Sequence, residues 1–327
     1  MNVQRDRDGD ATPLDLSARA GWLYYVGGLT QDQIAGELRI SRQRAQRLVA
    51  RSMAEGLIRV RLEHPVSDCL SLEAALRDAY GLRLCRVGPS LGQGVDPVHC
   101  IAPFAAAEME RLLSAPEPIV MALGTGRTLR AAIENLRSME CDQHKLVSLN
   151  GNISPDGSAS FYDVVMRIAD KVRAPHYPMP LPQIAESAEE REVFYSLEPV
   201  QRVMRLARAA DVTLVGIGQM NDNAPLFKDG FMTAEELRRM RAAGAAGEIA
   251  GWAYDAEGRY LETGTNLRVA GVRVDPPGDN LVIGVAGGAD KLDGLRGALR
   301  GRILNGLITD ELTARALLGH YEAPRRD

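Results

Sequence analysis

Residues 29–60 hold the pattern that most constrains the fold of this chain. The segment LTQDQIAGELRISRQRAQRLVARSMAEGLIRV reads as two short helices joined by a tight turn. Thr30 is placed to cap the first helix, whose apolar residues recur at near-helical spacing as Ile34, Ala35 and Leu38. Arg39 and Ile40 fill the turn, and Ser41 is placed to cap the second helix. Two helices joined in this way are typical of a helix-turn-helix unit.

The second helix divides into an apolar side and a polar side. Its apolar stripe consists of Ala45, Leu48, Val49 and Met53. The opposite side carries Gln43, Gln46 and Arg47, with Arg42, Arg44 and Arg51 beside them. Gly56 ends the helix, and the alternation over residues 57–62 predicts a short wing-like strand. This division suits a helix that packs on its own domain by one side and on DNA by the other.

The charge of this region supports DNA binding. Five arginines and no acidic residue lie between Arg39 and Arg51, although the whole chain carries a net charge of −4. A basic patch on an acidic chain attracts phosphates to one face only. Gln43, Gln46 and Arg47 are therefore our candidates for base contacts. Arg42, Arg44 and Arg51 are expected to contact phosphates, and Ser41 completes the predicted DNA-binding set. A helix with merely solvated arginines is the alternative.

Length and composition fit a two-domain globular protein. The chain has 327 residues, of which 45% are hydrophobic and 25% are charged. No apolar run approaches the ~18 residues that span a bilayer, so no membrane association is expected. The four cysteines form no CxxC pair and the five histidines are scattered, so we expect no metal, no other cofactor and a reducing cytoplasm. Residues 1–12 are predicted to be a disordered tail, and residues 13–64 to be the helix-turn-helix domain.

Residues 65–323 are predicted to form an α/β effector domain. Buried strands are predicted from apolar runs at residues 82–87, 119–123, 145–149, 212–217, 267–274 and 281–286. Helices are predicted over residues 71–80, 101–113, 128–136, 161–172, 200–210, 233–243, 292–300 and 310–318. This alternation predicts a mainly parallel sheet covered on both faces. The proline-rich residues 174–182 are expected to be extended without regular structure, and residues 305–311 to form a turn in which Thr309 caps the last helix.

Glycine-rich or polar residues follow several of the predicted strands. These residues are Gly124, Thr125, Gly126, Arg127 and Thr128, then Asn150, Gly151 and Asn152, then Gly218 and Gln219, and finally residues 287–291. Loops of this kind at the carboxyl ends of parallel strands offer backbone N–H groups to an anion or to hydroxyl groups. The loop at 124–128 has neither the Walker spacing nor the GxGxxG spacing. It therefore suits one phosphate or a polyhydroxylated sugar.

The chain resembles the SorC family of bacterial sugar-responsive transcriptional regulators from about residue 14 to residue 318. The resemblance is carried by the helix-turn-helix segment and by LGTGRTL, TLVGIGQM, GAAGEIAGWAYDAEG, GVAGGADK and LNGLITDELTA. It implies a Rossmann-like effector domain similar to sugar-phosphate isomerases and deaminases, in a homo-oligomer that is a tetramer or a dimer. It also implies that the 124–128 loop, residues 150–152, Gln219, Glu248 and Lys291 contact the effector.

Two departures from the family pattern bear on the effector. Some members have a lysine where this chain has Asn150, and one branch uses that lysine to form an imine with its sugar phosphate. Asn150 therefore argues against a covalent mode. Glu248 stands where the family pattern GAxGD has an aspartate, so the ligand is expected to differ in size or pose.

These observations predict a regulator of a carbohydrate or polyol operon that binds operator DNA and is controlled by a sugar, a sugar phosphate or a polyol. One alternative is a sugar-phosphate isomerase or deaminase fused to a DNA-binding domain, with Glu248 and Lys291 or Asp255 as acid and base. A third reading is an architectural DNA-binding protein with a vestigial domain. Glu248 and Lys291 could instead form a structural ion pair. Tyr24 and Tyr25 are expected to bury the first helix and to take part in a subunit contact.

Overall fold

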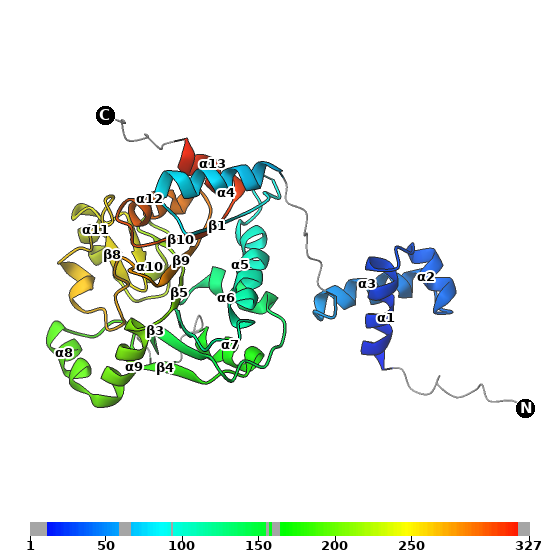
Figure 1. The fold of residues 1–327 in the computed structure, drawn as a ribbon, viewed down its shortest axis with the longest axis horizontal. Coiled ribbons are helices and arrows are strands. Elements are labelled where there is room, and N and C mark those ends of the chain that lie inside the picture. Colours follow the sequence, from blue (N-terminus) through cyan, green and yellow to red (C-terminus); the bar gives the residue numbers. More distant parts are fainter. Residues whose placement is uncertain (1–11, 59–66, 93, 155–156, 159–163, 320–327) are drawn as a thin grey trace, which may run out of the picture. The chain divides into compact units, whose positions relative to one another are not determined.

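The computed structural model describes residues 12–58, 67–92, 94–154, 157–158 and 164–319 (Figure 1). The chain divides into two compact units, residues 1–64 (unit 1) and residues 65–327 (unit 2). The tail predicted at the N-terminus lies outside the described residues except for Thr12. Within the described ranges, every helix is too short or too polar to cross a bilayer.

Unit 1 contains the predicted helix-turn-helix. Its helices are α1 (Pro13–Tyr25), α2 (Gln31–Glu37) and α3 (Arg42–Ala54). Both predicted N-caps are confirmed. The Thr30 hydroxyl accepts a hydrogen bond from the backbone N–H of Gln33 at 3.4 Å, and the Ser41 hydroxyl accepts from that of Arg44 at 3.3 Å. Arg39 in the turn adopts φ +52°, a left-handed conformation that glycine would adopt with less strain.

The core of unit 1 is small and lies between the three helices. Its buried members are Ala20, Ile34, Ala45, Leu48 and Val49. The predicted stripe of α3 is wrong at Met53, which is 41% exposed, whereas Ser52 is buried. Ser52 takes the inner position because α1 and α3 come very close there, and a β-carbon at Gly21 would overlap the Ser52 hydroxyl. The predicted wing is not a strand at residues 57–58, and residues 59–62 lie outside the described part.

Unit 2 is built on one parallel sheet of seven strands, which confirms the predicted parallel sheet and adds two strands that were not predicted. The strand order is β1-β10-β9-β5-β2-β3-β4, and each adjacent pair is parallel. The strands are β1 (Leu84–Gly88), β2 (Val120–Leu123), β3 (Lys145–Ile153), β4 (His176–Pro182), β5 (Val212–Val215), β9 (Leu281–Val285) and β10 (Gly306–Asp310).

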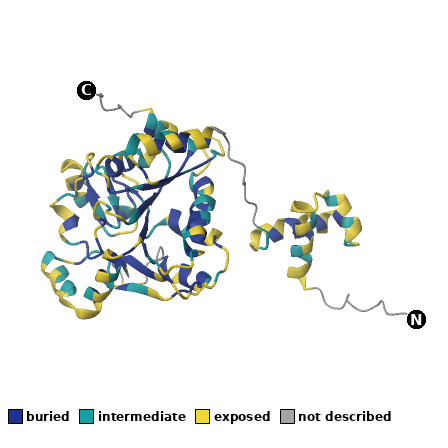
Figure 2. Ribbon diagram, viewed as in Figure 1, coloured by how far each residue is buried: buried dark blue, intermediate teal, exposed yellow. Residues whose placement is uncertain are grey.

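Helices cover both faces of this sheet. One face is covered by α5 (Val98–Leu113), α6 (Arg127–Asn135) and α7 (Val165–Val172). The other face is covered by α4 (Ser67–Tyr80), α9 (Glu198–Arg208), α12 (Leu292–Arg300) and α13 (Glu311–Leu318). Successive residues of β2 point to opposite faces, because Met121 belongs to the first core and Ala122 to the second. The buried strands run between the two helical layers (Figure 2).

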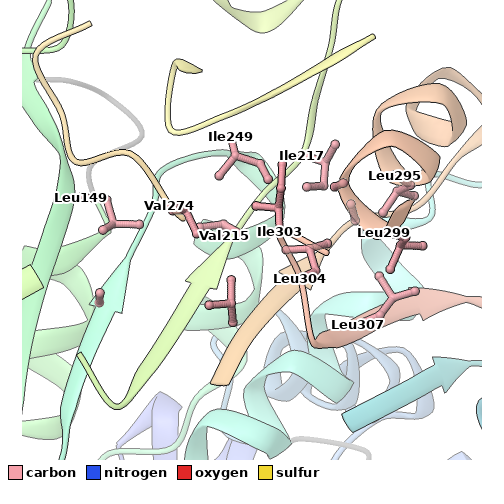
Figure 3. Packing of buried hydrophobic residues seen from close by; sticks show 14 of the residues in the cluster. Leu149, Val215, Ile217, Ile249, Val274, Leu295, Leu299, Ile303, Leu304 and Leu307 are labelled. Atoms are coloured by element: carbon pink, nitrogen blue, oxygen red, sulfur yellow. The ribbon is translucent and has the colours of Figure 1, made fainter. Parts of the chain in front are cut away.

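The second core also anchors the segments that leave the sheet. Ile217 beyond β5 and Ile249 of the small sheet lie near Leu295 of α12 (Figure 3). The small antiparallel sheet consists of β6 (Gly218–Gln219), β7 (Gly247–Ile249) and β8 (Trp252–Tyr254). The elements that border it are α10 (Pro225–Lys228), η1 (Gly264–Leu267) and η2 (Ala289–Lys291). Helix α11 (Ala234–Ala242) packs on η1, and α8 (Ala188–Ser196) packs on α9. This packing fixes the loops at the carboxyl ends of the strands.

The structure corrects several sequence expectations in unit 2. Residues 174–182 contain the edge strand β4, where prolines are tolerated because one side needs no backbone donor. Within the turn expected at residues 305–311, Gly306–Asp310 form strand β10. Asp310, not Thr309, caps α13 by accepting from the backbone N–H of Thr313 at 3.1 Å. Residues 267–274 form no strand, apart from an isolated bridge at Val269.

The strand order reverses direction between β2 and β5. From β2 the chain proceeds through β3 to the β4 edge, whereas from β5 it proceeds through β9 and β10 toward β1. The last bond of the β2–β5 pair runs from the Gly124 N–H to the Leu214 carbonyl oxygen at 2.9 Å. Beyond this hydrogen bond the segments that follow β2 and β5 separate, and a crevice opens at the carboxyl ends of the strands. Open α/β sheets bind ligands at such a switch point.

Candidate functional site

The predicted DNA-binding residues all lie on the exposed side of α3. They are Ser41, Arg42, Gln43, Arg44, Gln46, Arg47 and Arg51. Two of the arginines are paired at the surface: Arg42 Nε lies 3.4 Å from Asp32 Oδ1, and Arg51 Nε lies 3.3 Å from Glu55 Oε1. Exposed pairs of this kind are weak and exchange readily for other partners. The side of α3 that faces away from the core is therefore polar, basic and accessible.

Unit 2 contains a cavity of about 510 Å³ at the switch point between β2 and β5. Segments that are distant in the sequence form its walls. Four of them are residues 125–129 after β2, residues 216–219 after β5, Glu248 with Ala250 and Gly251 in and after β7, and Gly287, Asp290 and Lys291 after β9. A cavity of this size accommodates a small ligand. Of the predicted effector-binding residues, those in the lining are Thr125, Gly126, Arg127, Thr128, Gln219, Glu248 and Lys291.

The first wall of the cavity ends in the N-terminus of α6. Gly126 occupies the N-cap position of α6 with φ +127°, and it has no side chain that could cap the helix. The first backbone N–H groups of α6 consequently have no partner within the helix, and the helix dipole favours negative charge at this end. Arg127 adds a guanidinium to the same wall. This wall is suited to a phosphate or to electron-rich hydroxyl oxygens.

Glu248 extends from β7 into the opposite wall. Its Oε2 accepts a hydrogen bond from the Gly251 N–H at 2.8 Å. Burial raises the pKa of Glu248, while the Gly251 N–H and the charge of Lys291 act in the opposite direction. The carboxylate packs directly on Gly218, its partner in the β6–β7 ladder, so a side chain at 218 would displace it.

Lys291 lies beside this carboxylate, and its ammonium donates a hydrogen bond to the carbonyl oxygen of Ile217. Burial lowers the pKa of Lys291, the charge of Glu248 opposes that shift, and the charge of Arg127 adds to it. In the described part of the chain, Glu248 and Lys291 are neighbours that influence each other electrostatically without forming a direct ion pair. The carboxylate can therefore accept a further hydrogen bond from a group inside the cavity, and the ammonium can donate one.

The cavity lining combines polar and apolar residues, and its charges nearly balance. Its basic side chains are Arg127, Lys228 and Lys291, and its acidic side chains are Asp96, Asp229, Glu248 and Asp290. Burial raises the pKa of Asp229, and the charge of Arg127 opposes that rise. A mixture of donors and acceptors around one small space matches a molecule that bears several hydroxyl groups.

Four predicted effector residues lie outside the lining. Gly124 is buried at the end of β2. The expectation that residues 150–152 form a turn is wrong, because β3 continues through them to Ile153. Gly151 packs against the backbone of Leu181 and Pro182 in β4. Asn150 is buried, and among the described residues neither polar atom of its amide has a hydrogen-bond partner.

Sequence reasoning missed several lining residues. Lys228 and Asp229 lie on and just after α10, far from any predicted strand end, and no local pattern identifies them. Asp96 and Gln183 belong to segments without a motif. Ile217 could have been included in the predicted effector site, because it stands between Gly216 and Gly218 and both glycines line the cavity.

Asp255, the alternative acid or base, is not part of the lining. Its carboxylate pairs with Arg259 and accepts hydrogen bonds from the backbone N–H groups of Glu257 and Arg259 at 3.0 and 2.9 Å. These contacts hold a tight turn after β8. Asp255 therefore has a structural role in the arrangement observed.

Comparison with known proteins identifies similar chains over nearly the full length. A family model described as "Putative sugar-binding domain" matches residues 64–319. The chain is 34% identical to the erythritol catabolism regulatory protein EryD of Brucella abortus, over 93% of this chain and 96% of that protein. It is 33% identical to the transcriptional regulator LsrR of an Enterobacter species, over 94% of each. The crystal structure of the full-length sorbitol operon regulator SorC from Klebsiella pneumoniae superposes with a TM-score of 0.72 at 26% identity, covering 94% of this chain and all of that one.

Proposed function

The chain belongs to the SorC family of sugar-binding transcriptional regulators, and from this premise we propose a function for each of its two units. Unit 1 binds operator DNA through α3, and unit 2 binds a sugar, a sugar phosphate or a polyol in the cavity between β2 and β5. Effector binding changes the affinity for DNA. Coupling of this kind typically amounts to about 1–3 kcal/mol.

The cavity at the switch point is the observation that carries this proposal. It brings Arg127, Glu248 and Lys291 together from three segments of the sequence, with the free N-terminus of α6 beside them. Vicinal hydroxyl groups donate to carboxylates and accept from ammonium and guanidinium groups, so a polyol satisfies both kinds of partner at once. The names of EryD and SorC refer to erythritol and sorbitol, which supports a polyol or its phosphate as the effector class.

On the DNA side, we assign base contacts to Gln43, Gln46 and Arg47 and phosphate contacts to Arg42, Arg44 and Arg51. Ser41 fixes the start of the helix. Glutamine matches adenine and arginine matches guanine in the major groove. We further propose a homo-oligomer, a dimer or a tetramer, that acts in the cytoplasm on an operator with two-fold symmetry, because paired half-sites require paired recognition helices.

We propose that the cavity binds its ligand without converting it chemically. The alternative enzyme needs an acid and a base, and Asp255 is occupied in a turn while Glu248 is held by Gly251. The sequence similarity to proteins named as regulators supports the same choice. Turnover of ribose 5-phosphate or an amino-sugar phosphate by the full chain, abolished in Glu248→Gln, would favour the enzyme.

The effector assignment is tested by thermal unfolding of the full chain with a panel of polyols, sugars and their phosphates. One compound is expected to stabilise the protein, by about 2.7 kcal/mol at 100 times its Kd. Lys291→Met is expected to abolish that stabilisation. Lys145→Met is the matched control, because Lys145 is an exposed lysine at the N-terminal end of β3, whereas the cavity lies at the carboxyl ends of the strands. If no compound stabilises the protein, or if both variants respond alike, the assignment of this cavity is wrong.

A further inference from the structure

Two segments of unit 2 that lie 25 residues apart in the sequence meet behind the cavity. The segment AGGADK follows β9 and ends at Lys291, and the segment LITDELTA contains the end of β10 and the start of α13. Strands β9 and β10 are parallel neighbours, so the residues that follow them emerge at the same edge of the sheet. A hydrogen bond between Gly288 and Thr313 joins the two segments there.

The hydroxyl group of Thr313 links a buried carboxylate to the backbone of the loop after β9. It donates a hydrogen bond to Asp310 Oδ2 at 2.6 Å and accepts one from the Gly288 N–H at 2.7 Å. Asp310 Oδ1 accepts from the backbone N–H of Thr313 at 3.1 Å. Both side chains are only 3% exposed. Because the hydroxyl proton is directed at Asp310, the lone pairs of the hydroxyl oxygen are left for the Gly288 N–H.

Gly288 in turn sets the position of Lys291. Its carbonyl oxygen accepts a hydrogen bond from the Lys291 N–H at 3.1 Å across the single turn η2. The Lys291 ammonium then reaches the carbonyl oxygen of Ile217 in the cavity wall. Since the Gly288 N–H is already bonded to Thr313, the expectation that this glycine-rich loop offers its backbone N–H groups to an anion is wrong at Gly288.

Helix α13 is a firm support for this arrangement. Its residues Ala314 and Leu317 are fully buried in the core that covers one face of the sheet. The loop also approaches the helix closely, because a β-carbon at Gly287 would overlap Asp310 Oδ2. The loop after β9 therefore rests on the start of α13 by close packing at residue 287 and by a hydrogen bond at residue 288.

We propose that Thr313 is a positioning residue for the effector. Through Gly288 it holds Lys291 in the place where the ammonium group donates to a hydroxyl or phosphate oxygen of the ligand. Thr313 itself does not line the cavity, so it acts through the loop and not by contact with the ligand. A group that binds a ligand is held precisely when hydrogen bonds behind it lock its position. This inference rests on the proposed function, because it concerns the same cavity.

Calorimetric titration of Thr313→Val tests the inference, because valine keeps the volume of threonine and removes the hydroxyl group. The probes are erythritol, sorbitol and their monophosphates, titrated into the full chain. For the probe that binds the wild type most tightly, the Kd is expected to rise about tenfold, as it commonly does when a supporting hydrogen bond is removed. Thr313→Ser restores the hydroxyl group and should restore the Kd. An unchanged Kd in Thr313→Val, or an equal rise in Thr313→Ser, would overturn the proposal.

Thr309→Val is the matched control. Thr309 is a buried threonine of β10, and among the described residues its hydroxyl group has no hydrogen-bond partner. Its replacement by valine should leave the Kd and the thermal stability near the wild-type values. If Thr309→Val weakens probe binding as much as Thr313→Val does, a general disturbance of β10 explains both losses and the positioning role is rejected.

Amide hydrogen exchange of the full chain gives a second readout that needs no ligand. In the peptide that covers residues 286–292, exchange is expected to be faster in Thr313→Val and unchanged in Thr313→Ser and Thr309→Val. If Thr313→Val does not fold, Asp310→Ser replaces it, because serine still caps α13 but lacks the second oxygen that orients the Thr313 hydroxyl. Wild-type exchange in the variant that folds would overturn the proposal. If no probe binds the wild type, the proposed function fails, and the exchange measurement still decides whether Thr313 holds the loop.

Discussion

Glu248 and Gly218 face each other across the β6–β7 ladder, with the carboxylate resting on the glycine backbone where a β-carbon would otherwise lie. This contact positions the carboxylate in the cavity wall. It also joins the loop after β5 to the small sheet. The orientation of the main acidic group in the cavity therefore depends on the absence of a side chain at residue 218.

Gly218→Ala is expected to displace the Glu248 carboxylate and to weaken effector binding at least as much as Glu248→Ala does. Isothermal titration of the full chain with the effector found by thermal unfolding measures the loss. Gly278→Ala is the matched control, because a β-carbon there meets no neighbour within 4 Å and the backbone is not left-handed. Wild-type affinity in Gly218→Ala would show that the contact does not position the carboxylate.

The thermal stability of Glu248→Gln should rise relative to wild type as the pH increases from about 4.5 to about 7.5. Burial raises the folded-state pKa of Glu248 above the ordinary value of 4.5 for a glutamate. The stability contributed by the protonated carboxyl is complete below the unfolded pKa and is lost as the pH rises through the folded pKa. Glutamine does not titrate and keeps an oxygen for the Gly251 N–H. Each 1 kcal/mol corresponds to roughly 2–4 °C in Tm. A difference in Tm that stays constant or narrows over this range would contradict the shift.

On α3, Arg47→Ala should cost about 1–3 kcal/mol on the cognate operator and relax specificity at one base position. Arg44→Ala should weaken binding to cognate and scrambled DNA alike and reduce the salt dependence, because a phosphate contact carries no sequence information. Fluorescence anisotropy at two salt concentrations separates the two effects. Arg300→Ala, at an exposed arginine of unit 2, serves as the control. Identical behaviour of the Arg47 and Arg44 variants would reject the assignment.

Gly21→Ala should unfold unit 1 selectively. The added methyl group would overlap Ser52 and Ile58, and overpacking of this kind typically costs about 1–3 kcal/mol. DNA binding should be lost, whereas effector binding by unit 2 should persist. Gly36→Ala is the comparison, because it has free space in α2 and should stabilise the helix by up to about 1 kcal/mol. Loss of effector binding in Gly21→Ala would show that the two units do not fold separately.

The sequence predicts the elements whose signals are local. The caps at Thr30 and Ser41 are read from single residues, and the parallel sheet follows from long apolar runs. Strand β10 is missed because Asn305 and Gly306 resemble a turn and the strand has only five residues. Strand β4 is missed because its prolines disfavour a strand unless it lies at an edge, and edge position is set by the tertiary fold.

The same distinction applies to the cavity. Residues that follow a strand, such as Thr125, Gln219 and Lys291, are found by the rule for parallel sheets. Lys228 and Asp229 line the cavity because α10 packs on β6, the short strand after β5, and no short-range pattern encodes that packing. The prediction that Asn150 lies in a turn is wrong for a related reason, since the pairing of β3 with β4 extends strand β3 beyond its apolar run.

The central claim is that the cavity of unit 2 controls DNA binding by unit 1. The most direct test is fluorescence anisotropy of the full chain on DNA from upstream of its own operon, against a scrambled duplex, with and without the polyol and sugar-phosphate panel. We expect selective binding that one compound shifts by about 5- to 150-fold, with no shift in Lys291→Met and unchanged affinity of that variant without effector. Selective binding that no compound shifts, or a shift of equal size in Lys291→Met, would contradict it.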